Sequence, residues 1–186
     1  MGLAACAFSC NLSVAGRQAI QGSQEWPPCQ TRNSLPCWNI EAAILKHVYD
    51  TLQASHGKEV AQRTLASAVR ASAMAQAAEL AQRVNGATSM QTFIDRQELW
   101  TRGGALEREV LEQNEGRYRF NVTRCKYAEM YREMGLGEIG HLLSCQRDAT
   151  FCEGYDKRLK LKRTQTIMQG ASHCDFDYSY EKDQSA

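Results

Sequence analysis

The segment RYRFNVTRC, residues 117–125, alternates apolar and polar side chains, and its largest apolar residues are Tyr118, Phe120 and Val122. A period of two over this length is typical of a strand that is buried on one face only. Residues 114–116 (Asn-Glu-Gly) favour a tight turn, and the residues before that turn alternate more weakly. The segment therefore predicts a β-hairpin that turns at residues 114–116.

A second hairpin is predicted further along the chain. Residues 159–168 alternate again, Gly170 offers a turn, and Cys174, Phe176 and Tyr178 follow at a spacing of two. Each hairpin has one apolar face that must be covered. We therefore expect the two hairpins to form one small antiparallel sheet with helices packed on it.

Five segments place apolar residues at helical spacing. Three precede the first hairpin, at about 39–56, 58–84 and 88–100, and two shorter ones lie between the hairpins, at 126–134 and 138–152. The many alanines of the second segment indicate close approach between helices.

Local signals predict how two of these helices begin and pack. Asn39 is expected to cap the first helix, whose inward face would carry Ile40, Ile44 and Val48. Residues 88–91, a threonine followed three positions later by a glutamine, are expected to form the capping box of the third helix.

Together these elements predict an α+β fold. An N-terminal layer of three helices would pack on a small antiparallel sheet of two hairpins, with short helices between the hairpins. Residues 1–37 show neither period and are predicted to be a poorly ordered extension. Residues 38–181 would form one domain, and residues 182–186 a disordered tail.

Charge and hydropathy exclude several classes of partner. The 186 residues include 22 Lys and Arg against 21 Asp and Glu, a formal net charge of +1, which argues against a nucleic-acid partner. No apolar run approaches the roughly 20 residues that span a bilayer. Residues 1–14 lack the basic start and the unbroken apolar centre of a secretory signal. We therefore expect a cytoplasmic protein, without membrane contact, whose cysteines are reduced.

Three cysteines form the main candidate site. If the hairpins share one sheet, their ends can bring Cys125, Cys145 and Cys174 together; these three residues are called the thiol cluster below. Each could simply be a small buried apolar residue, which is common for free cysteine.

A metal site is a second interpretation of the thiol cluster. Zinc accepts three thiolates and a fourth ligand, but its sites usually contain closely spaced ligand pairs, which this sequence lacks. The candidates for a fourth ligand are His141, Cys152 and His173.

Nucleophilic catalysis is a third interpretation. A reactive thiolate requires a lowered pKa, which Arg124 or His173 could supply. His173 and Cys174 are adjacent on a predicted strand and would point to opposite faces, so His173 would serve another thiol, if any. Asp175 would share the face of His173, and Asp148 would lie on the helical face of Cys145.

Three separated motifs carry a family resemblance. They are FNVTRCKYAEMY at 120–131, LSCQRD at 143–148 with Glu153-Gly154, and RTQTIM at 163–168 continued by GASHCDF at 170–176. In this order they resemble the L-2-amino-thiazoline-4-carboxylic acid hydrolase family, and the resemblance extends over about residues 39–180.

The resemblance implies a hydrolase that opens a small cyclic isothiourea at a carbon–nitrogen bond, yielding S-carbamoyl-cysteine on the route to cysteine. The catalytic residues that it implies are Cys125, Cys145, Cys174, Asp148, Asp175 and His173. The substrate contacts that it implies are Arg124, Arg163, Thr166 and Tyr127. Where the family usually has an arginine after Cys-Asp-Phe, this chain has Asp177, which removes one candidate cation for the substrate carboxylate.

Two other function classes stay open at this stage. One is a non-catalytic sensor that binds a small molecule or a metal, and the other is a structural domain whose cysteines only pack. No cofactor is expected for the hydrolase, although a divalent metal stays open. The expected partner is a small-molecule substrate, and the alanine-rich helix allows a homo-oligomer.

Overall fold

A computed structural model describes residues 35–181, with side chains from residue 38 onward. The predictions for residues 1–34 and 182–186 lie outside the described residues. Residues 35–37, predicted to belong to the extension, instead form the first turn of a helix.

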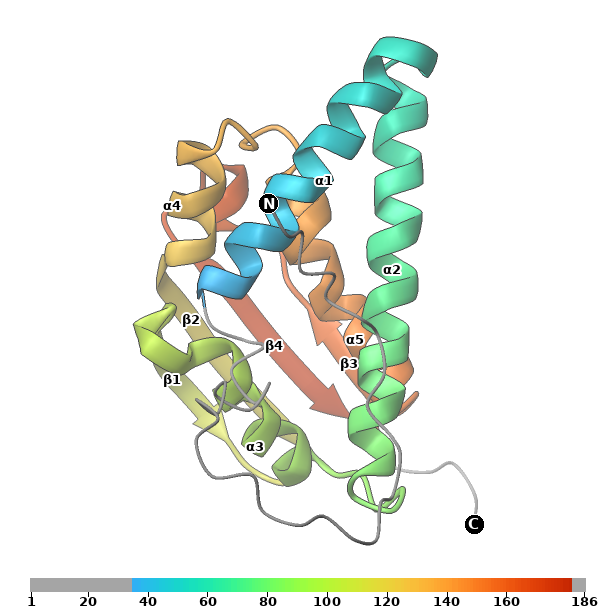
Figure 1. Ribbon diagram of the computed structural model, residues 1–186. Coiled ribbons are helices and arrows are strands. Elements are labelled where there is room, and N and C mark those ends of the chain that lie inside the picture. Colours follow the sequence, from blue (N-terminus) through green and yellow to red (C-terminus); the bar gives the residue numbers. More distant parts are fainter. Residues whose placement is uncertain (1–34, 182–186) are drawn as a thin grey trace, which may run out of the picture. The chain divides into compact units, whose positions relative to one another are not determined.

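A four-stranded antiparallel sheet is the centre of the fold (Figure 1). Its strands are β1 (Leu106–Gln113), β2 (Arg117–Cys125), β3 (Leu159–Lys162) and β4 (Cys174–Tyr180). The order β1-β2-β4-β3 means that the two predicted hairpins pair with each other through β2 and β4. The first hairpin turns where the sequence predicts, because Asn114 Oδ1 accepts hydrogen bonds from the backbone N–H groups of Gly116 and Arg117 at 2.9 and 2.8 Å.

The two faces of the sheet differ sharply in polarity. One face carries the apolar alternation of β2 and β4, and the β2–β4 register places Phe120 opposite Phe176, with ring centroids 4.8 Å apart. The other face carries charges, including Arg117, whose Nη2 lies 2.7 Å from a carboxylate oxygen of Asp177. The apolar face therefore needs a covering of helices, and the charged face does not.

The helices all lie on the apolar side of the sheet (Figure 1). The α-helices are α1 (Leu35–His56), α2 (Lys58–Gln82), α3 (Met90–Thr101), α4 (Lys126–Glu133) and α5 (Gln146–Tyr155). Shorter turns are η2 (Arg102–Gly104), the π-helix η3 (His141–Cys145) and η4 (Ile167–Gln169). These elements confirm the α+β class, and no described helix has both the length and the apolar content to cross a membrane.

Helix α3 makes the direct aromatic contact with the sheet, and α5 packs its aromatic side chains against α3. Phe93 of α3 contacts Tyr178 of β4 at a centroid distance of 4.7 Å and Phe151 of α5 at 6.3 Å. Helix α2 packs along α5, where Gly154 permits a very close approach to Ala77. The three-helix layer of the prediction is thus completed by α5, which was predicted only as a connecting helix.

Helix α1 packs with a different face from the predicted one. Ile40, Ile44 and Val48 are exposed at 65%, 60% and 42% of their surface, whereas Trp38 and Tyr49 are buried. The sequence of α1 carries two apolar stripes. The stripe with the larger aromatic side chains packs inward, because burying them stabilises the fold more than burying the smaller aliphatic side chains would. Asn39 is inside the helix rather than at its cap.

The cap of α3 is also shifted by one residue from the prediction. Ser89 accepts a hydrogen bond from the Thr92 backbone N–H at 3.1 Å, and the Ser89 N–H is bonded to Thr92 Oγ1 at 2.8 Å. Thr88, the predicted cap, instead donates its hydroxyl to Asp156. A long-range partner therefore decides which of the two adjacent hydroxyl residues caps the helix.

Two apolar clusters meet inside the described part of the chain. One joins α1, α2 and α4 around Tyr131, and the other joins α3, α5 and the sheet around Phe93. Partly buried residues such as Trp100, Leu106 and Cys125 contact both clusters.

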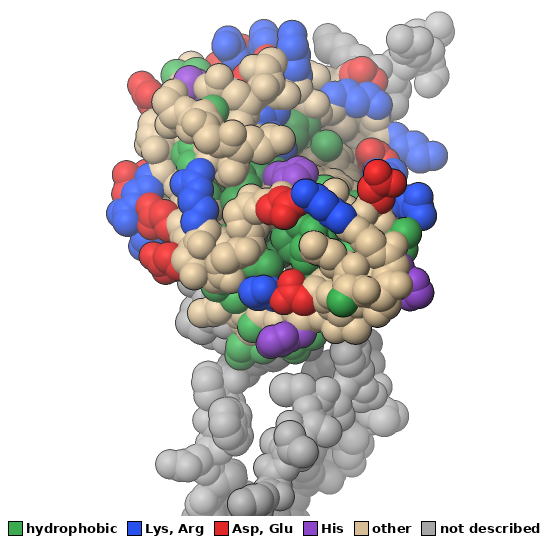
Figure 2. Space-filling view, turned by 90° about the horizontal axis from the view of Figure 1, so that it is seen from above, with side chains coloured by type: hydrophobic (Ala, Val, Ile, Leu, Met, Phe, Trp, Pro, Cys, Tyr) green, Lys and Arg blue, Asp and Glu red, His purple; other side chains and the backbone are tan. Residues whose placement is uncertain are grey.

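On the surface shown in Figure 2, acidic and basic side chains alternate without forming a field of one sign, as the balanced composition implies.

Candidate active site

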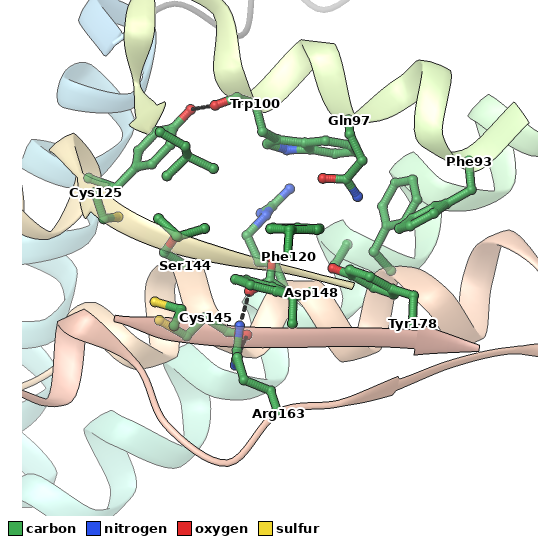
Figure 3. A pocket seen from close by; sticks show the side chains of 18 of the residues that line it. Phe93, Gln97, Trp100, Phe120, Cys125, Ser144, Cys145, Asp148, Arg163 and Tyr178 are labelled. Carbon is green, nitrogen blue, oxygen red and sulfur yellow. Dashed lines mark hydrogen bonds and ion pairs between the residues drawn. The ribbon is translucent and has the colours of Figure 1, made fainter. Parts of the chain in front are cut away.

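An internal cavity of about 80 Å³ lies at the seam between the two apolar clusters. Elements from α1 to β4 contribute to its wall, which is mainly apolar and rich in aromatic side chains. Figure 3 shows Cys125, Ser144 and Cys145 toward one end, and Gln97 and Tyr178 toward the other. This volume is below the roughly 300–1,000 Å³ of pockets for drug-sized ligands, which excludes a peptide.

The thiol cluster lines this cavity, as the sequence predicts. Cys125 is the last residue of β2, Cys145 is the last residue of η3, and Cys174 is the first residue of β4. The antiparallel pairing of β2 with β4 and the return of the chain through η3 bring these three positions together. Their proximity is thus a property of the sheet, whereas a catalytic role stays a prediction.

The predicted thiolate is not supported by the surroundings of the thiol cluster. Burial raises the pKa of the Cys125 thiol to about 11 and that of Cys145 to about 12. Burial also raises the pKa of Cys174, whose sulfur accepts a hydrogen bond from the Ile167 backbone N–H at 3.2 Å. All three are therefore protonated at neutral pH.

Neither basic residue that was expected to lower these thiol pKa values does so. Arg124 lies outside the cavity wall and binds Glu129 at 2.8 Å and Glu107 at 3.4 Å on the surface. His173 is held by Gln165, whose side-chain nitrogen lies 3.0 Å from a ring nitrogen. The expectation was wrong because sequence adjacency does not fix the direction of a side chain.

An ion pair between Asp148 and Arg163 forms the polar part of the cavity (Figure 3). Arg163 Nη1 donates to Asp148 Oδ2, and Arg163 Nη2 donates to the carbonyl of Cys145 at 2.8 Å. Asp148 is surrounded by protein, yet 35% of its side-chain surface stays accessible because it faces the cavity. Burial raises the pKa of this carboxyl group above its ordinary value, and Arg163 opposes that effect.

Arg147 is a second cation in the cavity wall, and the sequence reasoning missed it. Its Nη2 donates to Gln76 Oε1 at 3.0 Å, and its guanidinium lies 5.2 Å from the centroid of a Trp38 ring. Burial lowers the pKa of Arg147, although arginine stays charged at neutral pH. The only signal in the sequence was its position between Cys145 and Asp148 in the second motif.

Two further predicted catalytic residues lie outside the cavity wall. Asp175 accepts hydrogen bonds from the backbone N–H groups of Thr164 and Gln165 at 3.0 and 2.8 Å. Its burial alone would raise its pKa, but these bonds and the Thr164 hydroxyl hold that pKa below the ordinary value. Asp175 and His173 thus anchor the loop between β3 and β4.

Of the predicted substrate contacts, some line the cavity and others lie outside its wall. Tyr127 lines the cavity and donates its hydroxyl to the carbonyl of Trp100 at 3.1 Å. Thr166 lies outside the cavity wall and caps η4 by accepting a hydrogen bond from the Gln169 N–H at 3.3 Å. Asp177 alternates with Phe176 and Tyr178, which line the cavity, so position 177 faces the opposite side of the sheet.

The metal interpretation finds no matching arrangement. Within the described residues, no three His, Cys, Asp or Glu side chains are grouped so that they could hold one ion. Cys152, one candidate fourth ligand, donates its thiol to the carbonyl of Asp148 at 3.3 Å and is not part of the cavity wall.

The π-helix η3 helps to position the cavity residues. The backbone N–H of Gln146 bonds to the carbonyl of His141, five residues earlier, which widens this turn. Ser144 and Cys145 from the wide turn, and Asp148 from the helix that follows it, all line the cavity. Such turns occur frequently at functional sites.

A family model, described as L-2-amino-thiazoline-4-carboxylic acid hydrolase, matches residues 37–178. The chain belongs to this family. The matched range contains every residue of the cavity wall. A search of curated proteins gave no match.

Membership in the L-2-amino-thiazoline-4-carboxylic acid hydrolase family agrees with the resemblance that the motifs carry. Among solved structures, the phenol-responsive sensory domain of the transcription activator PoxR with phenol is similar at a TM-score of 0.48. It shares 15% sequence identity over 75% of this chain and 73% of that chain. This likeness is too remote to bear on fold or ligand.

Proposed function

We propose that the cavity hydrolyses a small cyclic isothiourea of the 2-amino-thiazoline-4-carboxylate type. The observation that carries the proposal is the meeting of the thiol cluster with the Asp148–Arg163 pair in one cavity, within a chain of this hydrolase family. The hydrolase name belongs to the family, whereas the substrate and the mechanism are our proposal.

In the proposed reaction, a water molecule attacks the ring carbon that lies between sulfur and nitrogen. Asp148 accepts one proton from that water as the new carbon–oxygen bond forms. The bond from this carbon to the ring nitrogen then breaks as the new hydroxyl becomes the carbonyl of the product. The departing nitrogen receives both protons of the water, one returned by Asp148 and one from that hydroxyl. One water is consumed, the exocyclic nitrogen is retained, and the product is S-carbamoyl-cysteine.

Two features favour Asp148 as the group that moves the proton. Its pKa is raised by burial, which makes the carboxylate a stronger base than an exposed aspartate. Arg163 fixes its orientation and is itself held by the carbonyl of Cys145. The accessible part of Asp148 faces the open volume of the cavity, where substrate would lie.

The thiol cluster is assigned to binding rather than to attack. With a pKa of about 11, only on the order of one Cys125 in ten thousand is a thiolate at neutral pH. Protonated thiols are weak hydrogen-bond donors and polarizable contacts, which suits the sulfur atom of a thiazoline ring. Either an enzyme thiolate or an activated water could attack the ring carbon, and the proposal therefore takes the activated water.

The test is product formation from 2-amino-thiazoline-4-carboxylate, followed by mass spectrometry. We expect Asp148→Asn to lower kcat by about 10²- to 10⁴-fold, with substrate binding retained. Asp50→Asn is the matched control, because this exposed carboxylate of α1 binds Lys46 at 2.7 Å and is remote from the cavity wall. Full turnover by Asp148→Asn would contradict the assignment.

Cys→Ser variants of the thiol cluster test the choice between water and thiol. We expect each variant to keep turnover within about tenfold of the wild type, because a lost thiol contact changes binding rather than the attacking group. A variant that binds substrate normally but has no turnover would identify that cysteine as the nucleophile. The hydrolase proposal would then stand with a different mechanism.

A non-catalytic binding domain is the second candidate, and one observation favours it. All three cavity thiols are shifted toward the protonated, unreactive form, within a mainly apolar wall. Tight binding of the thiazoline acid without any turnover by the wild type would support this candidate. A role in cysteine formation, a cytoplasmic location and self-association stay predictions that accompany the hydrolase proposal.

A further inference from the structure

The charged groups of the cavity wall are unequally paired. The wall carries Arg147, Asp148 and Arg163, and the carboxylate of Asp148 is bound to Arg163. Within residues 38–181, no carboxylate lies within ion-pair distance of Arg147, and the nearby Glu41 acts on it only through its field. The cavity wall therefore has a net charge of +1, which Arg147 supplies.

Arg147 also has hydrogen-bonding capacity left. Of its five N–H donors, the one described bond uses Nη2, which donates to Gln76 Oε1 at 3.0 Å. Arg163 is more fully committed, since one amino group donates to Asp148 and the other to the carbonyl of Cys145, whereas Arg147 has no carboxylate partner among the described residues. A ligand that enters the cavity thus meets Arg147 as the available cation.

A second unpaired donor lies beside Arg147. The Trp38 indole ring, which faces the guanidinium at 5.2 Å, is 7% exposed, and its N–H has no hydrogen-bond partner among the described residues. Of the buried polar atoms in that condition, only this one belongs to the cavity wall. The nitrogen itself is buried, so it leaves the wall with an uncompensated donor but supplies no contact to a ligand.

We propose that Arg147 binds the carboxylate of the ligand, and that the cavity thereby selects small monoanionic heterocycles over neutral ones. This inference rests on the proposed function. It makes Arg147, in place of Arg124 or Arg163, the contact of the ligand carboxylate. The ligand ring would extend from Arg147 toward Asp148 and the thiol cluster, which line the same cavity.

The physical reason for selection is the cost of an unpaired buried charge. A neutral ligand removes water from Arg147 without supplying an opposite charge, which is unfavourable. A carboxylate supplies that charge and can accept two parallel hydrogen bonds from the guanidinium fork. We therefore expect Arg147 to have a larger effect on the ratio of the two ligand affinities than on the affinity for the neutral ligand.

The experiment uses isothermal titration calorimetry to compare two ligands that differ only in the group at ring position 4, 2-amino-thiazoline-4-carboxylate and its carboxamide. We expect the wild type to prefer the acid by about 10- to 100-fold, the range of a charge-assisted hydrogen bond. Arg147→Gln should abolish this preference while retaining affinity for the carboxamide. Arg147→Lys should keep an intermediate preference, because it retains the charge but loses the planar fork.

The control variant is Arg83→Gln, which removes an exposed arginine of the α2 C-terminus that is paired with Glu79 and remote from the cavity wall. It should keep the wild-type preference. A purely structural role of Arg147 would weaken both ligands equally and leave their ratio unchanged, which would overturn the proposal. If Arg147→Gln does not fold, Arg147→Lys decides, because an undiminished preference there overturns the assignment to the guanidinium fork.

The outcomes also separate this inference from the proposed function. A wild type that hydrolyses the acid but binds acid and carboxamide equally overturns carboxylate recognition and leaves the hydrolase intact. A wild type that binds neither ligand overturns both.

Discussion

Replacing Gly154 of α5 by alanine tests the helix packing behind the cavity. A Cβ atom at this position would lie 2.9 Å from the Cβ of Ala77, 2.9 Å from the carbonyl oxygen of Met74 and 3.1 Å from the Met74 Cα. Two of these three obstacles belong to the backbone of α2, which cannot rotate away. The added methyl group therefore has to push α2 and α5 apart.

Two opposing effects set the size of the change. Alanine is favoured over glycine inside a helix by about 1 kcal/mol. Overpacking of a tight contact costs about 1–3 kcal/mol, and contacts with the backbone place Gly154 in the upper part of that range. We expect a net loss of about 1–2 kcal/mol, which corresponds to a decrease in Tm of about 2–8 °C for a chain of this size.

Thermal unfolding followed by circular dichroism measures this change. The control is Gly137→Ala, where the nearest atom is the flexible Arg132 Cγ at 3.8 Å, and where we expect a change within about 0.5 kcal/mol. A Gly154→Ala protein as stable as the wild type would refute the close approach of α2 and α5. Combination with Ala77→Gly should recover part of the loss, since it removes one of the three contacts.

Four other groups of contacts lead to predictions of their own. Gly140→Ala should cost less stability than Gly154→Ala in the same melting experiment, because its closest obstacle, the Met168 thioether at 2.6 Å, can rotate aside; a larger cost would contradict this. Burial would raise the pKa of Asp156, but hydrogen bonds from Arg158, Thr88 and Tyr180 hold it below the usual range. The stability that it contributes, about 2 kcal/mol, should therefore be present above the unfolded pKa of about 3.9 and lost as the pH falls. Urea unfolding at several pH values should show that the free energy of unfolding depends less on pH in Asp156→Asn than in the wild type. An equal pH dependence would contradict the role given to Asp156. The thiol cluster should react slowly with iodoacetamide at pH 7, and faster toward pH 11 as thiolate forms, so that rapid labelling of one cysteine at pH 7 would be inconsistent with its burial. Because the Asp148 pKa is raised and its carboxylate is the proposed base, kcat should fall on the acid side at a pH above the ordinary aspartate range; a flat profile down to pH 4 would argue against this role.

The fold could be predicted from the sequence where the residue pattern and the packing agree. The alternation of Tyr118, Phe120 and Val122 leaves a strand only one way to bury its large side chains, and the turn at 114–116 fixes its partner. The inward face of α1 could not be predicted in this way, since Ile44 and Tyr49 lie on two competing apolar stripes. The structure buries the stripe with the larger aromatic side chains, Trp38 and Tyr49.

The candidate site could be predicted in position but not in electrostatics. Ordering along the two hairpins was sufficient to bring Cys125 and Cys174 to one place. The sequence does not show how deeply a thiol is buried or which carboxylate an arginine finds. For this reason we assign the role expected of Arg124 to a different residue, Arg147, whose described partners come from α1 and α2.

The position of the cavity at the seam between two apolar clusters has a consequence for cooperativity. A ligand held there contacts Trp38 and Tyr127 from one cluster, and Phe93 and Tyr178 from the other. Its binding energy is then available only while both clusters are intact, which couples their local opening. Saturating ligand should therefore slow amide hydrogen exchange in α4 and in β4 together. The two clusters would then open as a single cooperative unit.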